Sequence, residues 1–340
     1  MSGHLTIATT NGDLGGGEVM LLHLAEATRS LGHGVTVVGP RHPSGLVEAA
    51  SATGLAVVTL DVRDRRSYAV ALRAWDRRER QGLLWCNGLL PAAATAGHRD
   101  RVVHLHREPE GPQKGARLLA VRGARAVVVP SESMGARVGH TAVLPNWTEP
   151  LVLRPAAPLP ESPTIGFLGR TTVDKGVHLL ARAVRRLRDE GLSARLLVAG
   201  EARFGTAEDV QVVEAALAPL GDAVDRVGWI DRDDFFDRVD LAVFPSTWAE
   251  PFGLVAAEAM GSGVPFVISD AGALPEVAGA EHPWVARADD AVDLARVVGD
   301  ALRASAEQRE AARQASRLRW EQRFSPEAGA ERLAVLLSQL

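Results

Sequence analysis

The sequence predicts an α/β protein made of two doubly wound domains, and three observations support this prediction. Short β-branched runs alternate with longer amphipathic helical patterns, which is typical of a parallel sheet covered by helices on both faces. The alternation stops over a proline-rich stretch and then starts again. Hydrophobic residues make up 46% of the 340 residues and charged residues 24%, which is enough to build packed cores in two domains.

The alternation begins with a strand at residues 5–9 and a helix at residues 18–31. Apolar residues recur along one face of this helix, and Gly32 is placed to end it. The further strands predicted in this half lie at residues 35–38, 55–60, 83–86, 102–106 and 126–129.

A proline-rich segment at residues 145–163 interrupts this pattern. Proline lacks a backbone N–H group and cannot continue a helix or a central strand, so residues 149–163 are expected to form a linker. The domain plan is therefore a first domain at 1–148, the linker, and a second domain at 164–322. A last helix at 323–340 is expected to pack back on the first domain.

The second half repeats the alternation. In such sheets ligands bind beyond the carboxyl ends of the strands, so the expected site is a cleft between the two domains. The elements predicted here are strands at 164–168, 195–199, 223–227, 241–244 and 266–268, and helices at 175–190, 290–303, 305–322 and 326–340.

Composition excludes several classes of protein. The net charge of −4 gives no basic surface for nucleic acid. Cys86 is the single cysteine, so neither an internal disulfide nor a cysteine zinc site can form. No run of about 20 apolar residues predicts a membrane span, and the first ten residues lack the features of a signal peptide. A cytoplasmic protein is expected.

One loop with its following helix stands out. Residues 245–265 read PSTWAEPFGLVAAEAMGSGVP and follow the predicted strand at 241–244. A helix is expected to begin near Phe252, with Gly253 and Leu254 in its first turn. Backbone N–H groups in a first turn have no partner within the helix, so this end of the helix can bind phosphate.

The same stretch holds two glutamates, Glu250 and Glu258, eight positions apart. The complete stretch resembles the E-x7-E signature of retaining glycosyltransferases with the GT-B fold, especially glycosyltransferase family 4. Its continuation PFVISDAGALPE, which ends at Glu276, is similar to the same family. The resemblance implies two Rossmann-like domains facing across a cleft. It also implies an enzyme that moves a hexose-type sugar from a nucleotide sugar to an acceptor hydroxyl with retention.

Further similarity lies at the start of the second domain, where IGFLGR ends at Arg170 and is followed by Asp174, Lys175 and Gly176. The resemblance implies that Arg170 and Lys175 hold the donor diphosphate and act in catalysis. Fixed cations there would stabilise the charge that grows on the leaving group. The resemblance also implies that Glu258 binds the ribose and that Glu250, as a catalytic residue, binds the transferred sugar. The phosphates are expected at Phe252, Gly253 and Leu254.

In the first domain, the turn GGGE at residues 15–18 resembles a glycine-rich turn that faces the donor in the family. Gly16 and Gly17 are therefore expected at the donor. His104 and His106 alternate along a predicted strand and are expected to point to opposite faces. The family places a histidine at this strand end beside the transferred sugar. His106 matches that position better and is the catalytic residue expected in this domain.

Two places depart from the family pattern or complicate it. Trp147 and Glu149 stand where a glycine and an aspartate are usual at the hinge. Asp231 and Asp233 form a D-x-D pattern, which binds a metal–diphosphate in the other major glycosyltransferase fold. Helix capping explains this pattern better, so no metal site is expected.

The resemblance leaves the substrates open. UDP- and GDP-sugars both fit, and no cofactor besides the nucleotide sugar is implied. The acceptor is expected to be a small natural-product (antibiotic) precursor, with a lipid-linked or cell-wall acceptor as the alternative. The alternative activities are those of an epimerase or phosphorylase with the same fold. The protein is expected to act as a monomer or homodimer.

Overall fold

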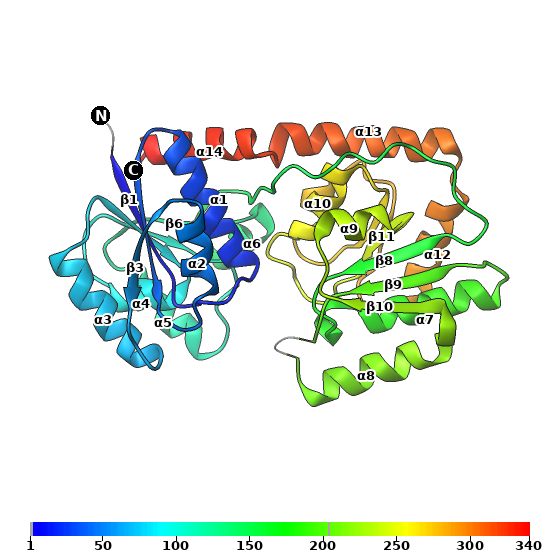
Figure 1. Ribbon diagram of the computed structural model, residues 1–340, viewed down its shortest axis with the longest axis horizontal. Coiled ribbons are helices and arrows are strands. Elements are labelled where there is room, and N and C mark those ends of the chain that lie inside the picture. Colours follow the sequence, from blue (N-terminus) through cyan, green and yellow to red (C-terminus); the bar gives the residue numbers. More distant parts are fainter. Residues whose placement is uncertain (1–2, 203–204) are drawn as a thin grey trace. The chain divides into compact units, whose positions relative to one another are not determined.

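The computed structural model describes residues 3–202 and 205–340 (Figure 1). The chain divides into two compact units. Unit 1 comprises Met1–Trp147 and Pro326–Leu340, and unit 2 comprises Thr148–Ser325. The chain therefore passes between the units twice. Residues 144–163, all of them described, form no helix or strand. Each unit is built on a parallel sheet, which confirms the predicted α/β class with two doubly wound domains.

The described part of unit 1 holds a seven-stranded sheet in the order β3-β2-β1-β4-β5-β6-β7, and every pair is parallel. The strand order reverses between β1 and β4, so the carboxyl ends of these two strands are the expected place for a ligand. The strands are β1 (His4–Ala8), β2 (Gly34–Pro40), β3 (Ala56–Leu60), β4 (Leu83–Asn87), β5 (Arg101–His104), β6 (Ala124–Val129) and β7 (Ala142–Val143).

The strand residues that point to each face of this sheet are apolar, so helices cover both faces. Ile7 packs into the cluster on one face and Ala8 into the cluster on the other. The helices of the first face are α1 (Gly16–Ser30), α2 (Gly45–Ala52) and α14 (Pro326–Ser338). Those of the second face are α3 (Arg65–Arg78), α4 (Leu89–Ala94), α5 (Pro112–Ala120) and α6 (Glu132–Val138).

The last helix of the chain, α14, lies alongside α1 (Figure 1). Leu333 and Leu336 of α14 join the apolar cluster of the first face. Gly329 lies against the ring of Trp147, since a Cβ atom there would come within 2.2 Å of it. The backbone oxygen of Trp147 also contacts His23 Nδ1 at 3.0 Å. The tryptophan that departs from the family pattern is thus a core residue of unit 1.

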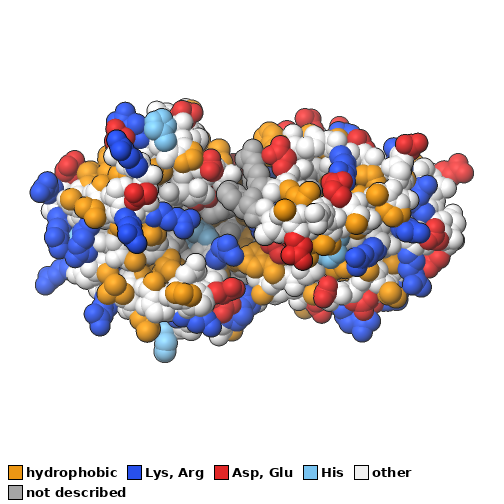
Figure 2. Space-filling view, turned by 90° about the horizontal axis from the view of Figure 1, so that it is seen from below, with side chains coloured by type: hydrophobic (Ala, Val, Ile, Leu, Met, Phe, Trp, Pro, Cys, Tyr) orange, Lys and Arg blue, Asp and Glu red, His pale blue; other side chains and the backbone are white. Residues whose placement is uncertain are grey.

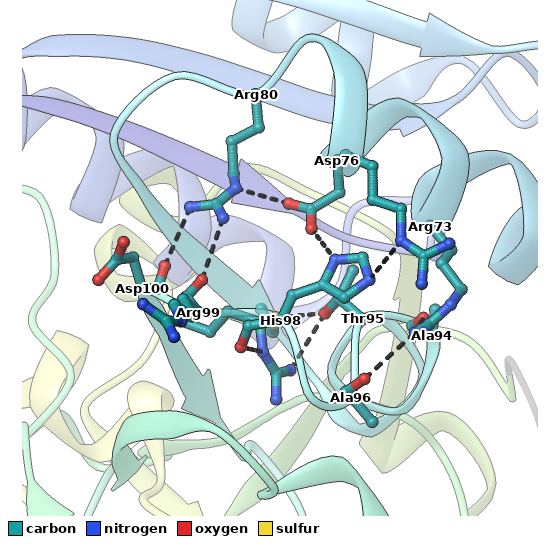
Figure 3. Close-up of polar contacts among 12 residues, drawn as sticks. Arg73, Asp76, Arg80, Ala94, Thr95, Ala96, His98, Arg99 and Asp100 are labelled. Carbon is teal, nitrogen blue, oxygen red and sulfur yellow. Dashed lines mark hydrogen bonds and ion pairs between the residues drawn. The ribbon is translucent and has the colours of Figure 1, made fainter.

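A buried polar network joins the end of α3 to the loop before β5 (Figure 3). Asp76 forms an ion pair with Arg80 at 2.7 Å and a second one with Nδ1 of His98. Arg77 Nε donates to Nε2 of the same imidazole at 3.2 Å. Arg80 also donates to the backbone oxygens of Arg99 and Asp100. The network lies at the amino ends of β4 and β5, which is the edge opposite to the expected ligand site.

Unit 2 contains, among its described residues, a six-stranded parallel sheet in the order β10-β9-β8-β11-β12-β13. Its strand order reverses between β8 and β11. The strands are β8 (Thr164–Leu168), β9 (Arg195–Ala199), β10 (Val224–Gly228), β11 (Leu241–Phe244), β12 (Phe266–Ser269) and β13 (Val285–Ala286).

Two apolar clusters cover the faces of this second sheet, as in unit 1. Val243 packs into one cluster and its neighbour Phe244 into the other. The helices of the first cluster are α7 (Val177–Asp189), α8 (Ala207–Leu217) and α12 (Ala291–Arg303). Those of the second are α9 (Arg232–Asp237), α10 (Leu254–Ser262), α11 (Leu274–Ala278) and α13 (Ala306–Arg323). Two short 3-10 helices lie at Val173–Lys175 and Ala218–Ala223.

The surface mixes charges of both signs. Figure 2 shows acidic, basic and hydrophobic side chains spread over one face of the molecule. Within the described residues, no helix combines the length and the apolar character needed to cross a membrane.

Candidate functional site

The loops after β8 and β11 meet at the strand-order reversal of unit 2. Gly176 has a φ of 74°, and a Cβ atom there would lie 1.8 Å from the carbonyl oxygen of Pro245. Only glycine permits both this conformation and this approach. The backbone N–H of Thr247 donates to the carbonyl oxygen of Asp174 at 2.9 Å. The loop after β8 is therefore docked on the loop after β11.

This docking brings Lys175 and Glu250 together. Lys175 Nζ lies 2.5 Å from Glu250 Oε1, and Ser246 Oγ donates to the same oxygen at 2.6 Å. Ser269 Oγ in turn donates to the backbone oxygen of Ser246 at 2.7 Å. Within residues 3–202 and 205–340, Glu250 Oε2 has no such partner. The Lys175 ammonium also lies 5.5 Å from the centre of the Trp248 ring.

The backbone of Glu250 is fixed by a second close approach. Gly272 has a φ of 61°, and a Cβ atom there would come within 2.3 Å of the Glu250 nitrogen. The next residue, Ala273, donates its N–H to the carbonyl oxygen of Glu250 at 2.9 Å. The carboxylate is therefore held from the backbone as well as by its side-chain partners. A side chain held in this way is arranged before any ligand arrives.

The helix α10 begins at Leu254, later than the predicted start near Phe252. Gly253 is the reason, because its φ of 99° lies outside the helical region. The Phe252 side chain is buried and meets Phe324 edge-on, with ring centres 5.5 Å apart. Its ring belongs to the core, so only its backbone remains for a ligand. Gly253 and Leu254 stand at the start of the helix, where unpaired N–H groups are expected.

Glu258 lies inside α10 and its side chain is 7% exposed. Arg232 Nη1 donates to its Oε1 at 2.8 Å. Burial raises the pKa of the Glu258 carboxyl, and the neighbouring Arg232 guanidinium opposes that shift. Sequence reasoning did not single out Arg232, although it lies between the two aspartates of the D-x-D pattern.

Those two aspartates cap and brace α9, which confirms the capping interpretation. Asp231 is the N-cap residue and accepts from the backbone N–H of Asp233 at 2.8 Å. Asp233 Oδ1 accepts from the backbone N–H of Val152 at 2.8 Å. Among the described residues, no group of three or more His, Cys, Asp or Glu side chains is arranged to hold a metal ion.

Arg170 lies on the loop after β8, as does Lys175. Its guanidinium pairs with Asp174 Oδ2 at 2.9 Å and is 37% exposed. Asp174 also accepts from the hydroxyl of Thr172. The structure therefore places Arg170 on the same loop as Lys175, but its ion-pair partner is Asp174 and not Glu250.

In unit 1, the glycine-rich turn, β4 and the segment after β5 meet beside the strand-order reversal. Gly16 and Gly17 are the first residues of α1. A Cβ atom at Gly17 would lie 3.3 Å from the His106 ring. Asn87 bridges the two, since its Nδ2 donates to the Gly17 backbone oxygen at 3.3 Å and its Oδ1 accepts from His106 Nε2 at 2.6 Å. Asn87 was missed from the sequence, although a polar residue ending a buried strand is a usable signal.

The prediction that His104 and His106 point to opposite faces is wrong. Residues two positions apart on a strand lie on the same face, and the two ring centres lie 4.0 Å apart. Trp85 Nε1 donates to His104 Nδ1 at 3.3 Å. Burial lowers the pKa of both imidazoles, that of His106 to about 4. His106 is therefore neutral near pH 7.

Comparison with known proteins gives a family match, similar curated proteins and a similar solved structure. Residues 162–304 match the family described as glycosyl transferases group 1. Glycogen synthase of Mycobacterium tuberculosis is 39% identical over 113 residues, which cover 32% of this chain and 26% of that protein. The 2-deoxystreptamine glucosyltransferase of Streptomyces kanamyceticus is 31% identical over 158 residues, which cover 45% of this chain and 40% of that protein.

The third result is structural. The protein HepE of Anabaena, in complex with UDP-glucose, has the same fold with a TM-score of 0.83. It is 20% identical in sequence, and the match covers 99% of this chain and 100% of that one. The predicted GT-B fold, with its two Rossmann-like domains, is thereby confirmed, as is the resemblance to glycosyltransferases. The matched part of each curated relative is less than half of that protein's length.

Proposed function

We propose that the protein is a retaining glycosyltransferase, because residues 162–304 match the family of group 1 glycosyl transferases. It moves a hexose-type sugar from a UDP- or GDP-sugar to a hydroxyl group of an acceptor. The observation that carries this proposal is the pair formed by Lys175 and Glu250 at the strand-order reversal of unit 2. An ammonium for phosphate and a carboxylate for sugar hydroxyls lie 2.5 Å apart there.

Unit 2 holds the donor in this proposal. The diphosphate lies at the start of α10, where the backbone N–H groups of Gly253 and Leu254 and the helix dipole favour an anion. Lys175 and Arg170 come from the neighbouring loop. Their positive charges stabilise the nucleoside diphosphate as it departs, when negative charge on it increases.

Glu250 binds the transferred sugar. Its Oε1 is occupied by Lys175 and Ser246, so Oε2 accepts from the sugar hydroxyls. The bond between sugar and diphosphate then lies close to both the ammonium and the carboxylate. Glu258 accepts from the ribose hydroxyls on the other side of the diphosphate.

The transfer step breaks the bond between the anomeric carbon and the diphosphate oxygen. The acceptor oxygen forms the new bond on the same face of the sugar, and its proton passes to the departing diphosphate. Unit 1 contributes the backbone of Gly16 and Gly17 and a neutral His106, which hydrogen-bonds to a sugar hydroxyl. Neutrality suits this role because a positively charged imidazole would repel the positive charge that grows on the sugar.

We propose a small natural-product (antibiotic) precursor as the acceptor and the cytoplasm as the location. The similarity to 2-deoxystreptamine glucosyltransferase supports this choice over a lipid-linked or cell-wall acceptor. UDP is the nucleotide to test first, because HepE, which has the same fold, was found with UDP-glucose.

Thermal-shift measurements with UDP, GDP and a panel of their sugars test the donor assignment. We expect one nucleotide and its sugars to raise the melting temperature; no shift with any of them would contradict the proposal. Incubation with the selected donor and candidate acceptors should then give a glycoside whose anomeric configuration, read by NMR, matches the donor. A sugar phosphate or an epimerised nucleotide sugar would instead indicate a phosphorylase or an epimerase.

A further inference from the structure

Arg232 is the residue that contacts the buried Glu258, and neither the family motif nor the proposed mechanism gives it a role. We propose that Arg232 is a positioning residue: it holds one oxygen of Glu258 so that the other accepts a hydrogen bond from the ribose of a nucleoside diphosphate. The inference rests on the proposed function, because it takes Glu258 as the ribose ligand.

The environment of Glu258 makes such a partner necessary. The carboxylate belongs to α10, whose neighbouring residues Ala257 and Ala259 are fully buried in an apolar cluster that also contains Phe235 of α9. Burial favours the protonated form of a carboxyl group, and a nearby cation offsets this preference. The contact at 2.8 Å places the Arg232 guanidinium where it provides that offset.

The two carboxylate oxygens of Glu258 have different surroundings. Arg232 takes Oε1, and Oε2 has no hydrogen-bond or ion-pair partner in the part of the chain that the structure describes. A carboxylate fixed at one oxygen cannot rotate freely, so its second oxygen keeps a defined direction. Glu250 is arranged in the same way, since Lys175 and Ser246 both contact one of its oxygens.

Arg232 is itself held by charge. Partial burial lowers the pKa of its guanidinium, but the carboxylates of Glu258, Asp231 and Glu149 together outweigh this and raise it. Glu149 follows Thr148, the first residue of unit 2. Carboxylates from three separate segments of the chain therefore act electrostatically on this guanidinium.

The experiment compares the binding of UDP and of 2′-deoxy-UDP by calorimetry, with GDP and 2′-deoxy-GDP used in the same way. Wild-type protein should prefer the ribonucleotide by about tenfold or more, the range expected for a hydrogen bond to a charged group. In R232Q the preference should fall to within about threefold. R238Q is the matched control, because Arg238 ends the same helix but pairs with the exposed Asp225 at 2.6 Å. It should keep the wild-type preference.

A pH series separates positioning from a merely structural role. Without the guanidinium, Glu258 takes up a proton at higher pH and loses an acceptor, so the affinity of R232Q for UDP should fall as pH is lowered from 8 to 6. Wild-type affinity should stay level over that range. R232K keeps the charge but not the planar fork, so it should restore the level profile and only part of the preference.

Each outcome has a distinct meaning. If wild-type protein binds neither UDP nor GDP, the proposed function fails and the inference fails with it. If wild-type protein binds and R232Q shows the same preference and the same pH profile, the inference alone is overturned. Should R232Q not fold, R232K decides the matter, because an unchanged preference in that variant contradicts a role for the guanidinium geometry.

Discussion

Asp76 in unit 1 and Glu250 in unit 2 are both almost fully buried carboxylates with a cationic partner, with 1% and 8% of their side chains exposed. Asp76 gives one oxygen to Arg80 and the other to His98, at the amino ends of the strands (Figure 3). Glu250 receives both of its side-chain contacts on Oε1, beside the carboxyl ends of β8 and β11.

Under the proposed function, burial and ion pairing do not by themselves identify a ligand site. A carboxylate whose two oxygens both have partners within the protein stabilises the fold. A carboxylate with one oxygen left, at a strand-order reversal and with its backbone fixed, can accept a ligand without losing its internal partners. The following predictions test this distinction, from the largest expected effect to the smallest.

The D76N variant should be strongly destabilised and otherwise normal. Removing one partner of a buried ion pair leaves Arg80 uncompensated, so the free energy of unfolding should fall by about 3–5 kcal/mol. Urea denaturation followed by tryptophan fluorescence measures this effect. Donor turnover per folded molecule should stay at the wild-type level. D61N is the control, since Asp61 is 76% exposed and its pair with Arg41 spans 3.6 Å. A folded D76N protein that lost its activity would contradict the distinction.

The K175A variant should show the reverse pattern. Turnover, measured as release of nucleoside diphosphate from the donor, should fall about 10²–10³-fold, because a fixed charge on the leaving group is lost. The melting temperature should fall less than in D76N, because Lys175 is 22% exposed and Ser246 still donates to Glu250. K114A removes the chain's other lysine and should behave as wild type. Near-wild-type turnover in K175A would refute the assigned role.

The E250A variant should lose turnover to a similar extent but keep its affinity for the free nucleotide. Glu250 contacts the sugar in our proposal, so UDP or GDP without a sugar should bind almost as well as to wild type. Calorimetry with the nucleotide and with the complete nucleotide sugar distinguishes the two contributions. An equal loss of affinity for both ligands would place Glu250 at the nucleotide instead.

The histidines extend the comparison, because His98 has the carboxylate of Asp76 beside it whereas His106 has the neutral Asn87. Burial lowers the pKa of His106 to about 4, below the ordinary value of 6.5. The unfolded chain therefore takes up a proton more readily, and the His106 contribution to stability is lost as pH falls from about 6.5 to about 4. H106N should lose less stability over this interval than wild type, in denaturation measured at several pH values. H42N, at an exposed position, should follow the wild-type curve.

The smallest effect is expected at Trp248, whose ring centre lies 5.5 Å from the Lys175 ammonium. Such a contact contributes about 0.5–1 kcal/mol at a partly exposed site. W248L should therefore reduce turnover only a few-fold, which steady-state kinetics can resolve. A loss as large as that of K175A would mean that Trp248 also binds a substrate directly.

The strands with continuous β-branched runs were predicted from the sequence, because each is long enough to show a pattern. The strands β7 and β13 have two residues each, and α4 and α11 have six and five, so no periodicity could reveal them. The start of α10 was misplaced by two residues because the conformation of Gly253 is set by the tertiary fold around it, where a Cβ atom would meet Leu274.

The candidate site was predictable where one short stretch carried several of its residues, as with Glu250, Gly253 and Glu258. Residues that join the site through tertiary contacts were missed. Asn87 at the end of β4 meets His106 in the segment after β5, and Arg232 meets Glu258 across 26 positions of the chain. The error at the histidines has a different cause, because residues two positions apart on a strand lie on the same face and not on opposite ones.

The attachment of α14 to unit 1 has a consequence for synthesis in the cell. The apolar face of α1 that includes Leu21 and Leu24 shares its cluster with Leu333 and Leu336. A ribosome that has made only residues 1–147 has therefore released a unit that lacks one of its covering helices. Unit 2 is contiguous in sequence and can finish folding first. Unit 1 is synthesised first, but it cannot complete its fold until residues 326–340 have been made. We expect the nascent first unit to expose this apolar surface longest, which makes it the part of the chain that a chaperone would bind.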